Sequence, residues 1–111
     1  MYSFNILKKI KNSRFILINK SSFIQSLKSC PNLIAGESTR LGGQGTFPYE
    51  SLNLGLYTGD SMETVLLNRS IYFESLGVKE RDVAGSHQVH GYDILEVETP
   101  GQYKGYDALV T

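Results

Sequence analysis

The chain has 111 residues, of which 41% are hydrophobic, and its eleven basic and eleven acidic side chains give a formal net charge of zero. These values are ordinary for a soluble globular protein with one modest core. No apolar run approaches the roughly 20 residues that span a bilayer. We therefore expect no membrane partner.

Charge is unevenly distributed along the chain. Residues 1–36 hold six Lys and Arg and no carboxylate, whereas residues 37–111 hold all eleven Asp and Glu against five basic residues. A basic, acid-free start is compatible with a targeting segment, a nucleic-acid-binding arm, or a solvated leader. Because no secretory cleavage pattern follows, we favour a solvated leader, or a first strand and helix. We expect no nucleic-acid partner.

The chain has one cysteine, Cys30, so it cannot form an internal disulfide. This fits a reducing compartment, and we expect a cytoplasmic location. Pro31 follows Cys30 directly, and neither histidine is near it in the sequence. An inert loop or core thiol is therefore favoured over a nucleophile.

Branched and aromatic residues predict strands over four segments: 14–19, 32–38, 94–97 and 107–111. Between the first two, Ser21 or Ser22 is expected to cap a short helix running to about Ser29. The segment 79–82 is a charged turn or a fresh helix cap.

The clearest helix signal spans residues 60–76. Asp60 and Glu63 have capping-box spacing, and Gly77 is well placed to end the helix. Asn68 and Arg69 interrupt its expected apolar face, which is formed by Met62, Val65, Leu66, Phe73 and Leu76. Arg69 is either a surface side chain lying along the helix or an anchor for the neighbouring loop.

Residues 41–59 hold five of the eleven glycines together with several apolar side chains, which is typical of a packed binding loop. Its glycine run, 42–45, fits neither the P-loop nor the dinucleotide-binding pattern. Beside Arg40, it is either an amide-rich turn that holds an anion or a plain turn with a surface arginine. Asn53 suits a ribose or base contact, or a brace for the loop.

His87 and His90 are three residues apart, and the glycines at 85 and 91 make a helix improbable. On a strand the two side chains would point to opposite faces, so at most one could reach a given metal ion. From these residues alone, ordinary polar histidines are favoured. A zinc site needs three or four ligands, and the chain has no further histidine.

Several short motifs occur in a fixed order: STRLGG at 38–43, PYESLNLG at 48–55, GD at 59–60, NR at 68–69, QVHG at 88–91 and DALVT at 107–111. Over about residues 32–111 they resemble the N-terminal half of the YfiH/laccase-domain proteins, a family of purine nucleoside phosphorylases with an older label of multicopper polyphenol oxidase. Glu37 departs from the pattern, since many members have an aromatic residue there.

The resemblance implies an α/β (α+β) domain of mixed β-sheets flanked by helices. Residues 22–111 would be its N-terminal part, truncated at the C-terminus, and residues 1–21 a leader of uncertain role. The implied activities are phosphorolysis of adenosine, inosine, guanosine and methylthioadenosine, and deamination of adenosine. The implied partners are purine nucleosides and phosphate.

The resemblance also implies site residues. His90, and not His87, would be a catalytic zinc ligand, joined by a later Cys and His that this chain lacks. Arg40, Gly43, Asn53 and Gln88 would bind substrate or phosphate. Copper, from the older label, is less favoured, because blue-copper sites need a His₂Cys set.

A different class of function is left open. A chain lacking two zinc ligands would bind zinc poorly and would be a non-catalytic fragment. Such a fragment would have unpaired strand edges through which it could associate.

Overall fold

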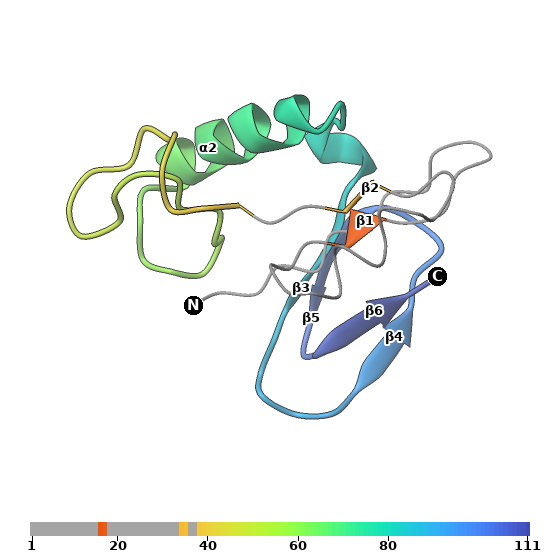
Figure 1. Ribbon diagram of the computed structural model, residues 1–111. Coiled ribbons are helices and arrows are strands. Elements are labelled where there is room, and N and C mark those ends of the chain that lie inside the picture. Colours follow the sequence, from red (N-terminus) through yellow and green to blue (C-terminus); the bar gives the residue numbers. More distant parts are fainter. Residues whose placement is uncertain (1–15, 18–33, 36–37) are drawn as a thin grey trace. The chain divides into compact units, whose positions relative to one another are not determined.

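A computed structural model describes residues 16–17, 34–35 and 38–111 (Figure 1). These residues belong to two compact units. One unit comprises residues 38–80, and the other comprises residues 81–111 with the two short segments at 16–17 and 34–35. The helix predicted before Ser29 and the thiol of Cys30 lie outside the described residues.

The unit of residues 38–80 consists of a long loop followed by helix α2, Met62–Ser75 (Figure 1). The helix prediction over 60–76 is confirmed, but the predicted cap is wrong. Ser61 is the N-cap, and its hydroxyl accepts a hydrogen bond from the Thr64 N–H at 3.4 Å. Asp60 accepts instead from the Ser61 N–H at 2.7 Å and from the side chain of Asn53. Its carboxylate is thus engaged outside the helix.

The end of α2 follows the prediction for Gly77. This residue has φ of 69°, a left-handed conformation that glycine adopts without a steric penalty. The Val78 N–H donates to the Phe73 carbonyl at 2.8 Å, and the Gly77 N–H donates to the Glu74 carbonyl at 2.9 Å. This pair of bonds is the Schellman motif, which satisfies the last carbonyls of a helix.

The buried face of α2 differs from the expected one. Met62 and Leu66 are 52% and 47% exposed. The buried residues follow the helical period without interruption: Val65, Asn68, Arg69, Tyr72 and Phe73. Asn68 and Arg69 therefore lie within the buried face. The physical reason is that the neighbouring loop offers backbone N–H and C=O groups, which need polar partners when they are buried.

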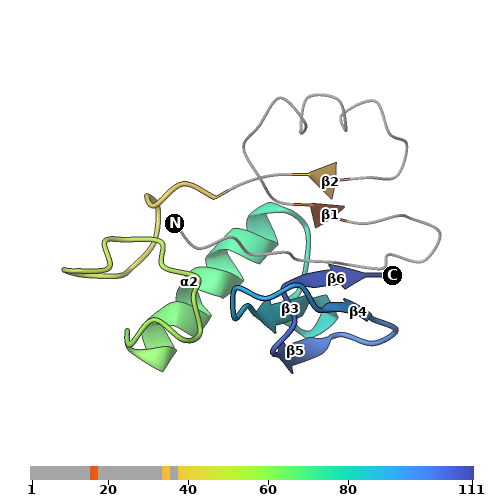
Figure 2. The same cartoon turned by 90° about the horizontal axis from the view of Figure 1, so that it is seen from below.

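The second unit is built from three parallel strand pairs (Figure 2). Strand β1 (Ile16–Leu17) pairs with β2 (Ile34–Ala35). Strand β3 (Ala84–His87) pairs with β5 (Gly101–Lys104). Strand β4 (Ile94–Glu96) pairs with β6 (Ala108–Val110). A short 3-10 helix, Glu80–Asp82, precedes β3.

Strands β1, β2, β4 and β6 confirm the four predicted strands, each over a shorter span. Strands β3 and β5 were not predicted, because their sequences, AGSH and GQYK, have little β-branched content. The α/β character is thus present. The pairs among the described residues are all parallel, however, so the mixed sheets that we expected are not found among them.

The core of this second unit is small. It centres on Ala84, Val97 and Leu109, against which Leu95, Tyr103 and Tyr106 pack. Ala84 is the first residue of β3, Val97 directly follows β4, and Leu109 lies in the middle of β6, so this core joins both of the strand pairs β3–β5 and β4–β6. In the part of the chain that the structure describes, no helix is long and apolar enough to cross a membrane.

Candidate functional site

Helix α2 holds the glycine-rich loop through Asn68, whose side chain is fully buried. Its Oδ1 accepts from the Gln44 N–H at 2.7 Å, and its Nδ2 donates to the carbonyls of Ser51 and Asn53 at 3.0 and 3.1 Å. One amide side chain therefore joins both halves of the loop. Its donor and acceptor geometry suits asparagine and no isosteric apolar residue.

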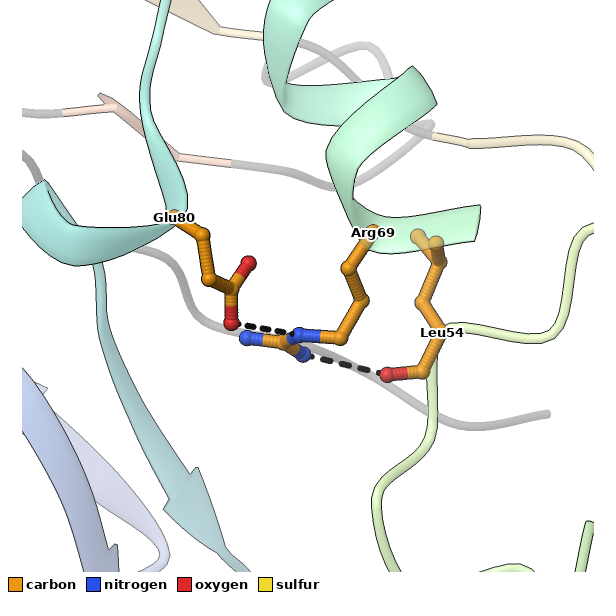
Figure 3. A network of polar contacts seen from close by, with 3 residues as sticks. All are labelled: Leu54, Arg69 and Glu80. Carbon is orange, nitrogen blue, oxygen red and sulfur yellow. Dashed lines mark hydrogen bonds and ion pairs between the residues drawn. The ribbon is translucent and has the colours of Figure 1, made fainter. Parts of the chain in front are cut away.

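Arg69 continues this attachment from the next position on the helix. Its Nη1 donates to the Leu54 carbonyl at 3.1 Å, and its Nε pairs with Glu80 Oε1 at 2.8 Å (Figure 3). The guanidinium lies 5.0 Å from the ring centroid of Phe73, and the residue is 2% exposed. Of the two interpretations left open by the sequence, the structure confirms Arg69 as an anchor for the loop.

The amides of the glycine turn point into the loop. The N–H groups of Gly43 and Gly45 donate to Ser51, at its Oγ (3.1 Å) and its carbonyl (2.8 Å). A Cβ added at Gly43 would lie 2.2 Å from the Ser51 carbonyl oxygen and 2.6 Å from Asn68 Oδ1. Glycine is therefore required at 43 by close packing. Its amide is already engaged, which leaves it poorly placed to hold an anion.

The backbone of Arg40 is hydrogen-bonded to the loop, and its side chain is exposed. Its carbonyl accepts from the N–H groups of Ser51 and Leu52 at 2.7 and 2.9 Å. The residue is exposed, and its guanidinium makes no hydrogen bond or ion pair within the described residues. Of the anion site expected from the sequence, the guanidinium is the part that is open to a ligand.

Asn53 braces the loop. Its Nδ2 donates to Thr58 Oγ1 at 2.7 Å and to Asp60 Oδ2 at 3.0 Å, and its Oδ1 accepts from the Gly55 N–H at 3.0 Å. This is the second of the two roles that the sequence left open. A ribose or base would have to share these groups with the loop.

His90 lies beyond the sheet. Strand β3 ends at His87, and Gln88–Gly91 forms an irregular turn, so the premise that both histidines share a strand is wrong. His90 has φ of 60° and is exposed. The side chain of Gln88 donates to the Asp107 carbonyl at 2.8 Å. The turn that follows β3 therefore has one exposed imidazole, that of His90.

The described residues do not by themselves fit a zinc ion. Zinc is held by three or four His, Cys, Asp or Glu side chains. Within the ranges that the structure describes, no three such side chains come together. His90 is therefore a single candidate ligand.

The predicted site residues fall into two sets. Arg40, Gly43 and Asn53 lie on the loop of the first unit, and Gln88 and His90 lie on one turn of the second. Sequence reasoning missed Ser51 and Asp107, which hold these segments in place. Each occurs within a motif, but nothing in the local pattern separates a side chain that holds the backbone from one that contacts a ligand.

Comparison with known proteins shows which proteins this chain is similar to. The chain is similar to a purine nucleoside phosphorylase of Streptomyces coelicolor, with 43% identity over 65 residues, 59% of this chain and 27% of that protein. A purine nucleoside phosphorylase of Deinococcus radiodurans is 38% identical over 87 residues, 77% of this chain and 34% of that protein. The purine nucleoside phosphorylase YfiH of Escherichia coli is 41% identical over 63 residues, 57% and 26%.

The matches thus span between about a quarter and a third of the length of these relatives. No solved structure matches the chain. The family model described as multi-copper polyphenol oxidoreductase laccase matches residues 34–111, which include the glycine loop, α2 and the His90 turn. The chain therefore belongs to this family, that of the YfiH-type laccase-domain proteins.

Proposed function

We propose that this chain supplies part of the active site of a zinc-dependent purine nucleoside phosphorylase that also deaminates adenosine. The proposed substrates are phosphate with adenosine, inosine, guanosine or methylthioadenosine, and the proposed location is the cytoplasm. The names of the relatives support the phosphorylase activity. The observation that carries the proposal is the exposed His90, presented on the turn of the QVHG motif.

Two side chains have distinct roles in this proposal. Arg40, with its guanidinium open to solvent, would bind phosphate and orient it for attack at the anomeric carbon of the ribose. His90 would be the metal ligand that this chain contributes. The further ligands would come from outside the described residues, since these provide no cluster of three.

The experiment that tests the proposal compares His90→Ala with His87→Ala. Phosphate-dependent release of base from inosine and release of ammonia from adenosine are measured, together with bound zinc. We expect His90→Ala to lose activity by about a hundredfold or more and to lose zinc, because one ligand of three or four is removed. His87→Ala should keep both. Turnover by His90→Ala at unchanged zinc content would contradict the ligand assignment.

The same measurements test a second reading, in which this chain alone is not catalytic. The observation that favours it is the single candidate ligand among the described residues. In that case the unaltered chain binds zinc weakly and shows no turnover. Its outer strand edges would then favour association, which gel filtration over a range of concentrations would detect.

A further inference from the structure

The backbone of His90 is in an unusual conformation. Its φ is 60°, and among the described residues it is the only non-glycine residue with a left-handed backbone conformation. L-residues with a Cβ avoid this region, so it persists only where the surroundings enforce it. The immediate neighbours, Val89 and Gly91, are exposed, but the backbone N–H of each is hydrogen-bonded.

One carboxylate, that of Asp107, accepts both of these hydrogen bonds. Asp107 Oδ1 accepts from the Val89 N–H at 3.0 Å, and Asp107 Oδ2 accepts from the Gly91 N–H at 2.8 Å. The two amides flank His90 on either side. A carboxylate that accepts two backbone N–H groups with separate oxygens fixes both the position and the orientation of the peptide units between them. His90 is the residue held between them.

Asp107 is itself anchored. Its N–H donates to the Asp93 carbonyl at 2.9 Å, and it directly precedes β6, whose Leu109 is in the core. Gly91 permits the close approach, since a Cβ added there would lie 3.0 Å from Asp107 Oδ2. The core of the second unit is thereby connected through β6 and one carboxylate to the turn.

From this arrangement we infer that Asp107 is a positioning residue, which holds His90 in its left-handed conformation so that the imidazole is presented at a fixed place for a metal ion. The inference rests on the proposed role of His90 as a ligand. Asp107 itself touches neither metal nor substrate in this arrangement. Its effect is exerted through the two amides.

The test uses the full chain and NMR. Hydrogen exchange of the Val89 and Gly91 amides and the ¹³Cα and ¹³Cβ shifts of His90 are measured in Asp107→Ala, Asp107→Asn and Asp93→Asn. Asp93→Asn is the matched control, because it removes the same charge close by, while Asp93 is exposed and contributes only its backbone carbonyl. Asp107→Asn keeps one acceptor oxygen and should lose protection at one of the two amides.

In Asp107→Ala we expect both amides to exchange on the order of tenfold faster and the His90 shifts to leave their left-handed values. Asp93→Asn should change neither. The Val97 N–H, bonded to the Val110 carbonyl at 2.7 Å, should stay protected in every variant and reports whether the sheet is intact. Unchanged exchange in Asp107→Ala, or equal acceleration in Asp93→Asn, would overturn the positioning role.

If Asp107→Ala does not fold, Gly91→Ala tests the same contact by pushing a methyl group against the carboxylate. Faster exchange at Val89 in that variant supports the inference, whereas faster exchange at Val97 without a change at Val89 contradicts it. A Zn²⁺ titration of the His90 ring then separates the two proposals. We expect the affinity to fall about tenfold in Asp107→Ala and to be unchanged in Asp93→Asn. A His90 ring whose signals do not respond to Zn²⁺ in the unaltered chain supports the second reading, in which this chain alone is not catalytic, while the exchange data still decide what Asp107 holds.

Discussion

The glycine-rich loop and the His90 turn are both irregular segments held by side chains from elsewhere in the chain, the loop from helix α2 and the turn from Asp107, which directly precedes β6. Asn68 and Arg69 hold the loop from within a buried helix face, and the amides of Gly43 and Gly45 bond to Ser51 within the loop. Asp107 holds the turn by its backbone and leaves the imidazole of His90 in solvent. In both segments the anchoring side chain bonds to backbone atoms, so the difference lies in burial: the anchors of the loop are buried with their partners, whereas Asp107 is half-buried and the residue between its two amide partners is exposed.

The comparison also predicts whether a substitution lowers the stability of the whole fold or changes only the local structure. Asn68 and Arg69 are 0% and 2% exposed, so losing either leaves buried polar groups without partners. Asp107 is half-buried, and the amides it bonds are exposed and can turn to water. Substitutions at the loop anchors should therefore reduce global stability, and substitutions at the turn should act locally.

Arg69→Ala should have the largest effect. It removes the partner of the Leu54 carbonyl and of Glu80 and leaves a cavity, so we expect the free energy of unfolding to fall by about 3–4 kcal/mol. Urea unfolding followed by circular dichroism measures this. Arg81→Ala is the control, because Arg81 lies 3.9 Å from Asp82 and is 76% exposed, and it should cost less than about 0.5 kcal/mol. Equal losses in the two variants would refute the anchoring role.

Gly43→Ala should have an intermediate effect of about 2–3 kcal/mol, since its Cβ would overlap the Ser51 backbone oxygen and that carbonyl cannot move without breaking loop contacts. Gly42→Ala measures the cost of the backbone conformation separately from the cost of a steric overlap. Nothing lies within 4 Å of a Cβ at that position, but φ is 97°, so we expect a cost of about 1–2 kcal/mol. Thermal unfolding ranks the two. A smaller loss at 43 than at 42 would mean that the loop adjusts freely around Ser51.

The smallest expected effect is the difference in stability between His90→Gly and His90→Ala. Glycine adopts φ of 60° without the Cβ penalty, so this variant should be more stable than His90→Ala by about 1 kcal/mol, although both lack the imidazole. Parallel urea titrations of the two variants provide the measurement. If alanine is the more stable of the two, the left-handed conformation is not held in solution.

The elements with strong local signals were predictable from the sequence. Helix α2 and its end at Gly77 follow from periodicity and from the special backbone freedom of glycine. Strands β4 and β6 follow from branched residues. The motifs around Arg40, Asn53 and His90 were also sufficient to indicate the family, which the family model matching residues 34–111 confirms.

Only the tertiary structure decided which polar side chains hold the fold and which remain available. The pattern that placed Met62 and Leu66 in the core could not show that the partner of α2 is loop backbone, whose carbonyls and amides select Asn68 and Arg69 instead. It also could not show that Asp107, sixteen residues after Gly91, reaches back to fix His90. Local sequence determines preferences over a few residues, whereas the satisfaction of a buried hydrogen-bonding group depends on partners brought near by the fold.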